Sequence, residues 1–201
     1  GGGYDHFALR SDNLNLVDSL KLKGYEVATL MERVLASGAD KLAGLTHPQQ
    51  PPYRLKGRGD MLPQATAKAI EILSSNRRGF FLMIEASQID WASHAHAADT
   101  LVDETLDLDR VVGVALDYAE RDGKTLVIVT ADHETGGVTI TDGDMKSKSI
   151  RLDFSTTGHT AVMVPVFAYG PGSGAFSGVY DNTELFHKIL DAYGFAELKQ
   201  P

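Results

Sequence analysis

Hydrophobic residues recur along the chain at two spacings, one typical of helices and one typical of buried strands. From residue 93 to 120 apolar side chains return every three or four residues, which predicts a long amphipathic helix. Three runs, 80–84, 125–130 and 161–168, are continuously apolar or β-branched, as in strands that are covered on both faces of a sheet. Because such strands alternate with helices, the pattern predicts a layered α/β domain.

Shorter elements complete this predicted order. Helices are predicted over 12–23, 30–36, 64–76 and 182–193, and a short strand over 25–28. Gly24, Gly38 and Gly194 follow three of these helices, at the position where a left-handed residue commonly ends a helix. Asp181 and Glu184 have the spacing of a capping box, which favours a helix start there.

Residues 46–63 interrupt the pattern with four of the seven prolines and two glycines. Loops longer than about 15 residues are usually functional or inserted. Two interpretations of this Pro-rich loop or insertion stay open, a surface segment that binds a partner and an irregular connection.

Composition narrows the function classes. The chain has 201 residues with 19 Lys and Arg against 27 Asp and Glu, a net charge of −8, and no cysteine. The acidic balance argues against nucleic-acid binding and anionic membranes, and no apolar run approaches the ~20 residues of a membrane span. Disulfides, thiolate metal ligands and cysteine nucleophiles are excluded. The chain opens with three glycines and no Met, so we expect the natural protein to extend further upstream.

Carboxylates and imidazoles lie next to the predicted strands, at the edge where ligands bind in open α/β sheets. Asp90 and His94 are four residues apart and therefore share one face of a helix. With His159 they offer two nitrogens and one oxygen and leave a fourth position open, as in a catalytic zinc site. The other donors at strand ends, which include oxygens suited to Mg²⁺, are Glu85, Asp132 and His133. Two ions about 4 Å apart can stabilise both the attacking and the leaving oxygen in phosphoryl transfer.

Structural alternatives exist for these residues. Asp90 could instead cap a helix N-terminus, and His94 could be a half-buried polar residue. Glu134 is expected to be a surface or supporting group. The remaining histidines lack an acidic companion or face another side of the helix, and are expected to be structural or exposed: His6, His47, His96 and His187.

Three strings together resemble the C-terminal half of bacterial alkaline phosphatases. They are FFLMIEASQID at 80–90, TLVIVTADHETGG at 125–137 and TTGHTAVMVPVFAYGPG at 156–172, in the order that the family has them. The opening GGG is similar to a glycine turn of the same family. The resemblance implies a three-layer α/β/α fold with a mostly parallel central sheet, of which residues 1–201 form the C-terminal portion as a partial domain.

The same resemblance implies the metal ligands. Asp90, His94 and His159 are expected to bind a first zinc, which in the family activates the water that cleaves a phosphoenzyme. Asp132 and His133 are expected to bind a second zinc, which in the family lowers the pKa of a serine nucleophile.

The resemblance also implies roles for four further residues. Glu85 is expected to be a Mg²⁺ ligand, and Trp91 is expected to lie near the phosphate. Thr135 and Thr160 are expected to support the ligands.

The family's Asp-Ser-Ala nucleophile segment and its phosphate-binding Arg are not found in this sequence, and neither Ser87 nor Ser93 stands in such a context. The prediction is therefore zinc- and magnesium-dependent hydrolysis of small phosphate monoesters, with the N-terminal half of the same protein as a partner and with an inactive isolated chain. A homodimer and a periplasmic or secreted location are implied by resemblance only. Two alternatives stay open: a sister metallohydrolase (a phosphodiesterase, nucleotide pyrophosphatase or phosphoglycerate mutase), and a metal-binding fragment without activity.

Overall fold

The chain divides into two compact units. In the computed structural model, residues 1–195 are described. The first unit comprises Gly1–Ile89 and Asp99–Val114, and the second comprises Asp90–Ala98 and the described residues from Ala115 onward. This division places Glu85 in the first unit and the other predicted metal ligands in the second. Among the described residues, no helix has the length and apolar character needed to cross a membrane.

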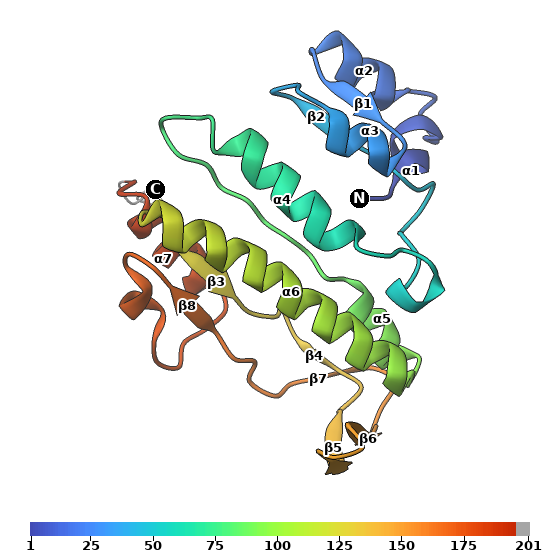
Figure 1. Ribbon diagram of the computed structural model, residues 1–201, viewed down its shortest axis with the longest axis vertical. Helices are drawn as coiled ribbons and strands as arrows, with labels where there is room; N and C mark the ends of the chain where they lie inside the picture. The colour runs from blue at the N-terminus through green and yellow to red at the C-terminus, as the bar shows by residue number, and fades with distance from the viewer. Residues whose placement is uncertain (196–201) are drawn as a thin grey trace. The chain divides into compact units, whose positions relative to one another are not determined.

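A parallel strand pair organises the first unit (Figure 1). Strands β1 (Glu26–Ala28) and β2 (Leu42–Gly44) pair with Val27 opposite Ala43, and helix α3 (Met31–Ala36) connects them. A Cβ atom at Gly44 would lie 2.8 Å from Val34 Cγ2, so glycine permits the close packing of this strand and helix. The buried apolar side chains of the unit include Val17, Ala28, Val34, Leu45, Met61 and Ile70.

Besides α3, the helices of the first unit are α1 (Tyr4–Ala8), α2 (Leu16–Leu22), the 3-10 helix η1 (Arg54–Lys56), α4 (Met61–Leu73) and part of α6 (Ala98–Asp122). Helix α2 is shorter than the predicted 12–23, and α4 begins three residues before the predicted 64–76, within the predicted loop. The sequence pattern does not predict α1 or η1. Asn15 caps α2, because its side chain accepts from the backbone N–H groups of Val17 and Asp18. Gly24 is left-handed after α2 with φ of 80°, as predicted. The prediction for Gly38 is wrong, because α3 ends in extended backbone at Ser37 and Gly38 is not left-handed.

The predicted strand at 80–84 does not form as a paired strand. Residues 80–84 belong to none of the sheets formed by the described residues. Its side chains nevertheless alternate, with Phe81 and Met83 exposed and Leu82 and Ile84 half-buried, as in an extended segment with two different faces. The local sequence therefore favours an extended conformation, whereas a strand also requires hydrogen bonds to the backbone of a neighbouring strand.

Antiparallel pairs make up the strands of the second unit. β3 (Val127–Val129) pairs with β8 (Phe167–Tyr169), and β4 (Glu134–Thr135) pairs with β7 (His159–Thr160). The predicted strand at 161–168 is therefore wrong in its bounds, because only its end is paired, in β8, and residues 161–166 have no regular structure. Pro165 contributes to this outcome, since proline has no N–H to donate to a ladder.

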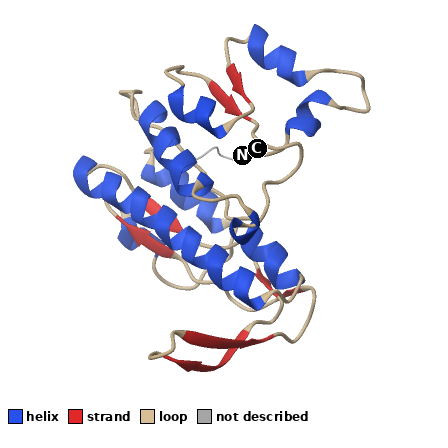
Figure 2. Ribbon diagram, turned by 45° about the vertical axis from the view of Figure 1, so that its right-hand side comes forward, coloured by secondary structure: helices blue, strands red, loops and turns tan. Residues whose placement is uncertain are grey.

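A hairpin of β5 (Thr139–Asp144) and β6 (Ser149–Asp153) stands apart from the other strands of this unit (Figure 2). Its register shifts between Ile140 and Asp142, as at a bulge. All residues of the hairpin except Leu152 are exposed. The unit closes with η2 (Ser173–Phe176) and α7 (Glu184–Ala192), the latter followed by the left-handed Gly194.

The long helix predicted from 93 to 120 is two helices. A short helix, α5 (Gln88–His94), ends before His96, and α6 begins at Ala98. The chain turns because His96 adopts a left-handed conformation with φ of 52°. The break matters for the site, because α5 alone carries Asp90 and His94.

Candidate metal centre

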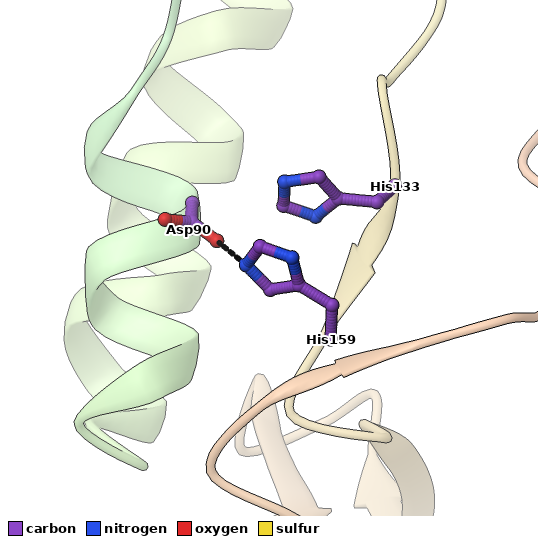
Figure 3. Close-up of side chains that lie close together, drawn as sticks. All are labelled: Asp90, His133 and His159. Carbon is purple, nitrogen blue, oxygen red and sulfur yellow. Dashed lines mark ion pairs between the residues drawn. The ribbon is translucent and has the colours of Figure 1, made fainter.

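Asp90, His133 and His159 bring their ligand atoms together within 4.8 Å of one another (Figure 3). They come from three places in the sequence: helix α5, the residue before β4, and β7. The β4 and β7 pairing sets Thr135 opposite His159, so the ladder itself brings the two imidazoles close. Their rings stack with centroids 3.5 Å apart, and His159 Nε2 lies 3.6 Å from Asp90 Oδ1.

His94 adds a fourth donor to this group. Its Nε2 lies 3.1 Å from His159 Nε2 and 3.4 Å from Asp90 Oδ1. Its other nitrogen, Nδ1, lies 2.5 Å from the carbonyl oxygen of Thr157. Because a carbonyl only accepts, Nδ1 carries a hydrogen, and in the neutral ring Nε2 then carries the lone pair that can bind a metal. The structure thus brings together Asp90, His94 and His159 with His133, a set of three nitrogens and one oxygen.

This donor set fits a divalent ion of the zinc type. Imidazole nitrogens with a carboxylate oxygen suit zinc, whereas Mg²⁺ and Ca²⁺ prefer oxygen ligands alone. The side chains are only partly buried, with exposed fractions of 36% for Asp90 and 46% for His159. A ligand from solvent can therefore reach the group.

Thr135 contacts the group directly. Its hydroxyl donates to Asp90 Oδ1 at 2.6 Å and lies 3.1 Å from His133 Nδ1, and the residue is buried. This hydrogen bond restrains the orientation of the Asp90 carboxylate. The alternative that Asp90 caps a helix is wrong, because α5 begins two residues earlier, at Gln88.

Glu134 and Thr160 stabilise the turn beside the group. The Glu134 carboxylate accepts from the N–H groups of Gly137 and Val138, at 3.2 and 3.0 Å, and from the Thr160 hydroxyl. The hydrogen bond from Thr160, helped by these N–H groups, lowers the pKa of Glu134 below its ordinary value. Thr160 thus contacts Glu134, whereas Thr135 contacts Asp90.

The other predicted site residues lie outside this group. The Asp132 side chain is 88% exposed, and its Oδ2 lies 3.3 Å from His133 Nε2. Trp91 is exposed on α5, next to Asp90. Glu85 is an exposed residue of the first unit. Their predicted roles toward a second zinc, phosphate and Mg²⁺ stay predictions.

The sequence alone did not reveal the contacts of His96. Its Nε2 lies 2.8 Å from the carbonyl oxygen of Thr156, and its ring stacks on Phe154 with centroids 4.7 Å apart. The spacing of two between His94 and His96 gives opposite faces in a continuous helix. The helix break removes that separation, and both imidazoles reach adjacent carbonyls of one loop.

Comparisons with known proteins agree on one family. The alkaline phosphatase family model matches residues 2–152 and 142–195. Alkaline phosphatase of Escherichia fergusonii is 38% identical over 149 residues, which cover 66% of this chain and 32% of the relative. Alkaline phosphatase 3 of Bacillus subtilis is 28% identical over 264 residues, covering 96% of this chain and 57% of the relative.

Solved structures extend the likeness to the fold. Alkaline phosphatase from the Antarctic bacterium TAB5 has a TM-score of 0.88 and 41% identity, and covers 98% of this chain and 60% of that chain. A variant of the same enzyme with Mg bound in its M3 site has a TM-score of 0.87 and 40% identity, with the same coverage. These structures confirm the predicted α/β fold class. The chain spans less than two thirds of the length of these relatives.

Proposed function

The chain belongs to the alkaline phosphatase family, and we propose that it supplies the metal-binding part of an enzyme that hydrolyses phosphate monoesters. The observation that carries the proposal is the convergence of Asp90, His133 and His159, from three separate parts of the sequence, on one point that solvent can reach. A phosphate monoester is a dianion at alkaline pH, and a cluster of this kind gives it a cationic partner once a metal is bound.

The proposed ligand set is divided between two zinc ions and one magnesium. We assign Asp90, His94 and His159 to the first zinc, Asp132 and His133 to the second, and Glu85 to Mg²⁺. The mutual distances of Asp90, His94 and His159, 3.1 to 3.6 Å between their donor atoms, support the first assignment, and the Mg bound in the TAB5 variant supports magnesium in a relative. When bound, zinc supplies positive charge that stabilises the charge developing on phosphoryl oxygens.

The chain's own residues would hold and orient this centre. The Thr157 carbonyl accepts from His94 Nδ1 and so directs His94 Nε2 to the group. The Thr135 hydroxyl holds the Asp90 carboxylate. We assign Trp91, which is exposed beside Asp90 on α5, to the border of a bound phosphate ester.

The serine nucleophile and the phosphate-binding Arg would come from an N-terminal portion that this chain does not match. Relatives are longer, and this chain covers 60% of the TAB5 enzyme. A homodimer and a periplasmic or secreted location are parts of the same proposal that rest on family membership alone.

Zinc stoichiometry tests the metal centre. After dialysis against zinc-free buffer, we expect at least one tightly held zinc per chain, measured by atomic emission. His159→Ala should abolish tight binding, while His187→Ala, on the exposed face of α7, should retain it. Unchanged zinc in His159→Ala would refute the assignment.

Hydrolysis of p-nitrophenyl phosphate with excess Zn²⁺ and Mg²⁺ tests the activity. We expect near-zero turnover for the chain alone. A fusion to the unmatched N-terminal part of the TAB5 enzyme should gain turnover that His159→Ala removes. Turnover by the chain alone at the level of a full-length relative would contradict the proposed division of labour. A fusion that cleaves diesters faster than monoesters would point to a sister hydrolase.

A further inference from the structure

We propose that His96, which offers no ligand to the metal group, is a positioning residue for it. Its imidazole holds the loop at residues 154–158, and this loop fixes where His159 enters the group. The inference rests on the proposed metal centre, and it adds a residue that neither family resemblance nor ligand geometry assigns.

The contacts of His96 all fall on this loop. A carbonyl can only accept, so the 2.8 Å contact between His96 Nε2 and the Thr156 oxygen requires Nε2 to donate. The ring also lies against Phe154, tilted by only 14°. The two contacts reach residues three and five positions before His159, so they restrain the chain just upstream of a proposed ligand.

The backbone of His96 is held in a conformation that most residues avoid. Its φ of 52° is left-handed, which costs about 1–2 kcal/mol for a residue with a Cβ. The turn satisfies the end of α5, because His96 N–H donates to Ser93 O and Ala97 N–H donates to Ala92 O. Glycine or asparagine would form such a helix end with less strain. The contacts of the imidazole with Thr156 and Phe154 explain why a histidine occupies this position.

The loop has little freedom on its other side. The N–H groups of Ser155 and Thr156 donate to the Gly136 oxygen at 3.0 and 3.2 Å, and Gly136 N–H donates to Gly158 O at 2.9 Å. A Cβ atom at Gly136 would lie 3.1 Å from Phe154 and 3.3 Å from Ser93 O. The loop is thus wedged between the end of α5, which carries Asp90, and the turn that follows β4.

His94 and His96 hold the loop at adjacent carbonyls, those of Thr157 and Thr156. Removing His94 would also remove a proposed zinc donor. Removing the His96 contact leaves all donors in place, so any loss of zinc affinity then reports on positioning alone.

Two substitutions separate the hydrogen bond from the ring. His96→Phe keeps an aromatic ring against Phe154 and loses the donor, whereas His96→Gln keeps an N–H donor at a similar reach. We expect zinc affinity, measured by chelator competition, to fall about 10-fold or more in His96→Phe, as for other partners of ligand-holding groups, and to recover in His96→Gln. The visible absorption of bound Co²⁺ should change in His96→Phe and return in His96→Gln. Wild-type affinity and an unchanged Co²⁺ spectrum in His96→Phe would overturn the proposal.

A measurement without metal keeps the two proposals distinguishable. In the metal-free chain, hydrogen exchange of the Ser155, Thr156 and Gly136 amides should accelerate in His96→Phe and return toward the wild-type rate in His96→Gln. If the unmodified chain binds no zinc, the metal-centre proposal fails. The hydrogen-exchange rates would still show whether His96 restrains the loop. Unchanged exchange in His96→Phe overturns that hold whatever the zinc result.

Discussion

Each unit contains one dense polar cluster, and the two clusters are built on opposite principles. In the first unit, Arg58 lies between Glu104 and Asp107 at 2.6 and 2.7 Å, and the three side chains are 5%, 2% and 0% exposed. In the second unit, Asp90 lies beside imidazoles that solvent can reach, and the exposed Asp132 contacts one of them, His133. The carboxylates of the first cluster pair with arginines, Asp107 with Arg54 and Arg110 as well as Arg58. The ion-pair partners of Asp90 among the described residues are instead the imidazoles of His94 and His159, whose nitrogens can offer electron pairs to a ligand. Polar density alone therefore does not mark a ligand site, and the proposed metal centre differs from the first cluster in the kind of groups that Asp90 faces.

The buried charges of the first cluster tie the 46–63 loop to α6. Glu104 accepts from the backbone N–H of Arg54 at 2.7 Å as well as from Arg58, and Asp103 pairs with Arg54. The loop is thus an anchored segment of the first unit. Buried charges of this kind are tolerated because each has a partner, and they become costly when one partner is lost.

The largest expected effect is on this self-neutralised cluster. Arg58→Met should lower the free energy of unfolding by about 3–5 kcal/mol, because Glu104 would remain buried without a cation and Asp107 would keep only Arg54 and Arg110. Urea denaturation of the metal-free chain measures it, with the exposed Arg33→Met as the matched control. A loss no greater than that of the control would mean that the two clusters do not differ in the way described.

A smaller effect should follow from zinc at the second cluster. At a zinc concentration of 100 times its Kd, the folded chain should gain about 2.7 kcal/mol relative to the chelator-treated chain. The gain should vanish in His159→Ala and persist in the Arg33→Met control. Thermal unfolding with and without zinc measures it, and equal stabilisation of His159→Ala would assign the effect to another site.

The smallest effect sharpens the comparison at the edge of the second cluster. Glu134→Ala removes the acceptor of three donors and should cost the metal-free chain about 1–2 kcal/mol near pH 7. Because the folded-state pKa of Glu134 lies below its ordinary value of 4.5, this contribution is present above pH 4.5 and is lost as the pH falls through the lowered pKa. Urea denaturation across that range should show the wild type converging on the variant in acid, with the exposed Glu120→Ala as control. A difference that stays constant down to acid pH would exclude the carboxylate as its source.

Sequence reasoning was strongest where the signal is local. That Asp90 and His94 lie together could be predicted, because helix geometry fixes which side chains share a face. The family strings added His159, which no local pattern links to Asp90. The α/β fold class could be predicted because segments with the hydrophobic spacing of strands alternate with segments that have the spacing of helices.

The remainder depended on partners distant in sequence. Arg58 and Glu104 are 46 residues apart, and neither residue type by itself indicates a buried ion pair. The break between α5 and α6 lacks glycine and proline, so nothing local ends the predicted helix at His96. The apolar run at 80–84 predicts a strand. A strand, however, is defined by backbone hydrogen bonds to a neighbouring strand, and the composition of one segment does not show whether that neighbour is present.

The β5 and β6 hairpin is a suitable site for attaching a label to this molecule. Its ladder is closed within itself, and its tip at Met145 is exposed, so changes there disturb few contacts elsewhere. A fluorophore or an affinity tag attached at the tip would leave Asp90, His133 and His159 untouched. The hairpin is therefore the natural attachment point for the labelled protein on which the zinc and exchange measurements could be made.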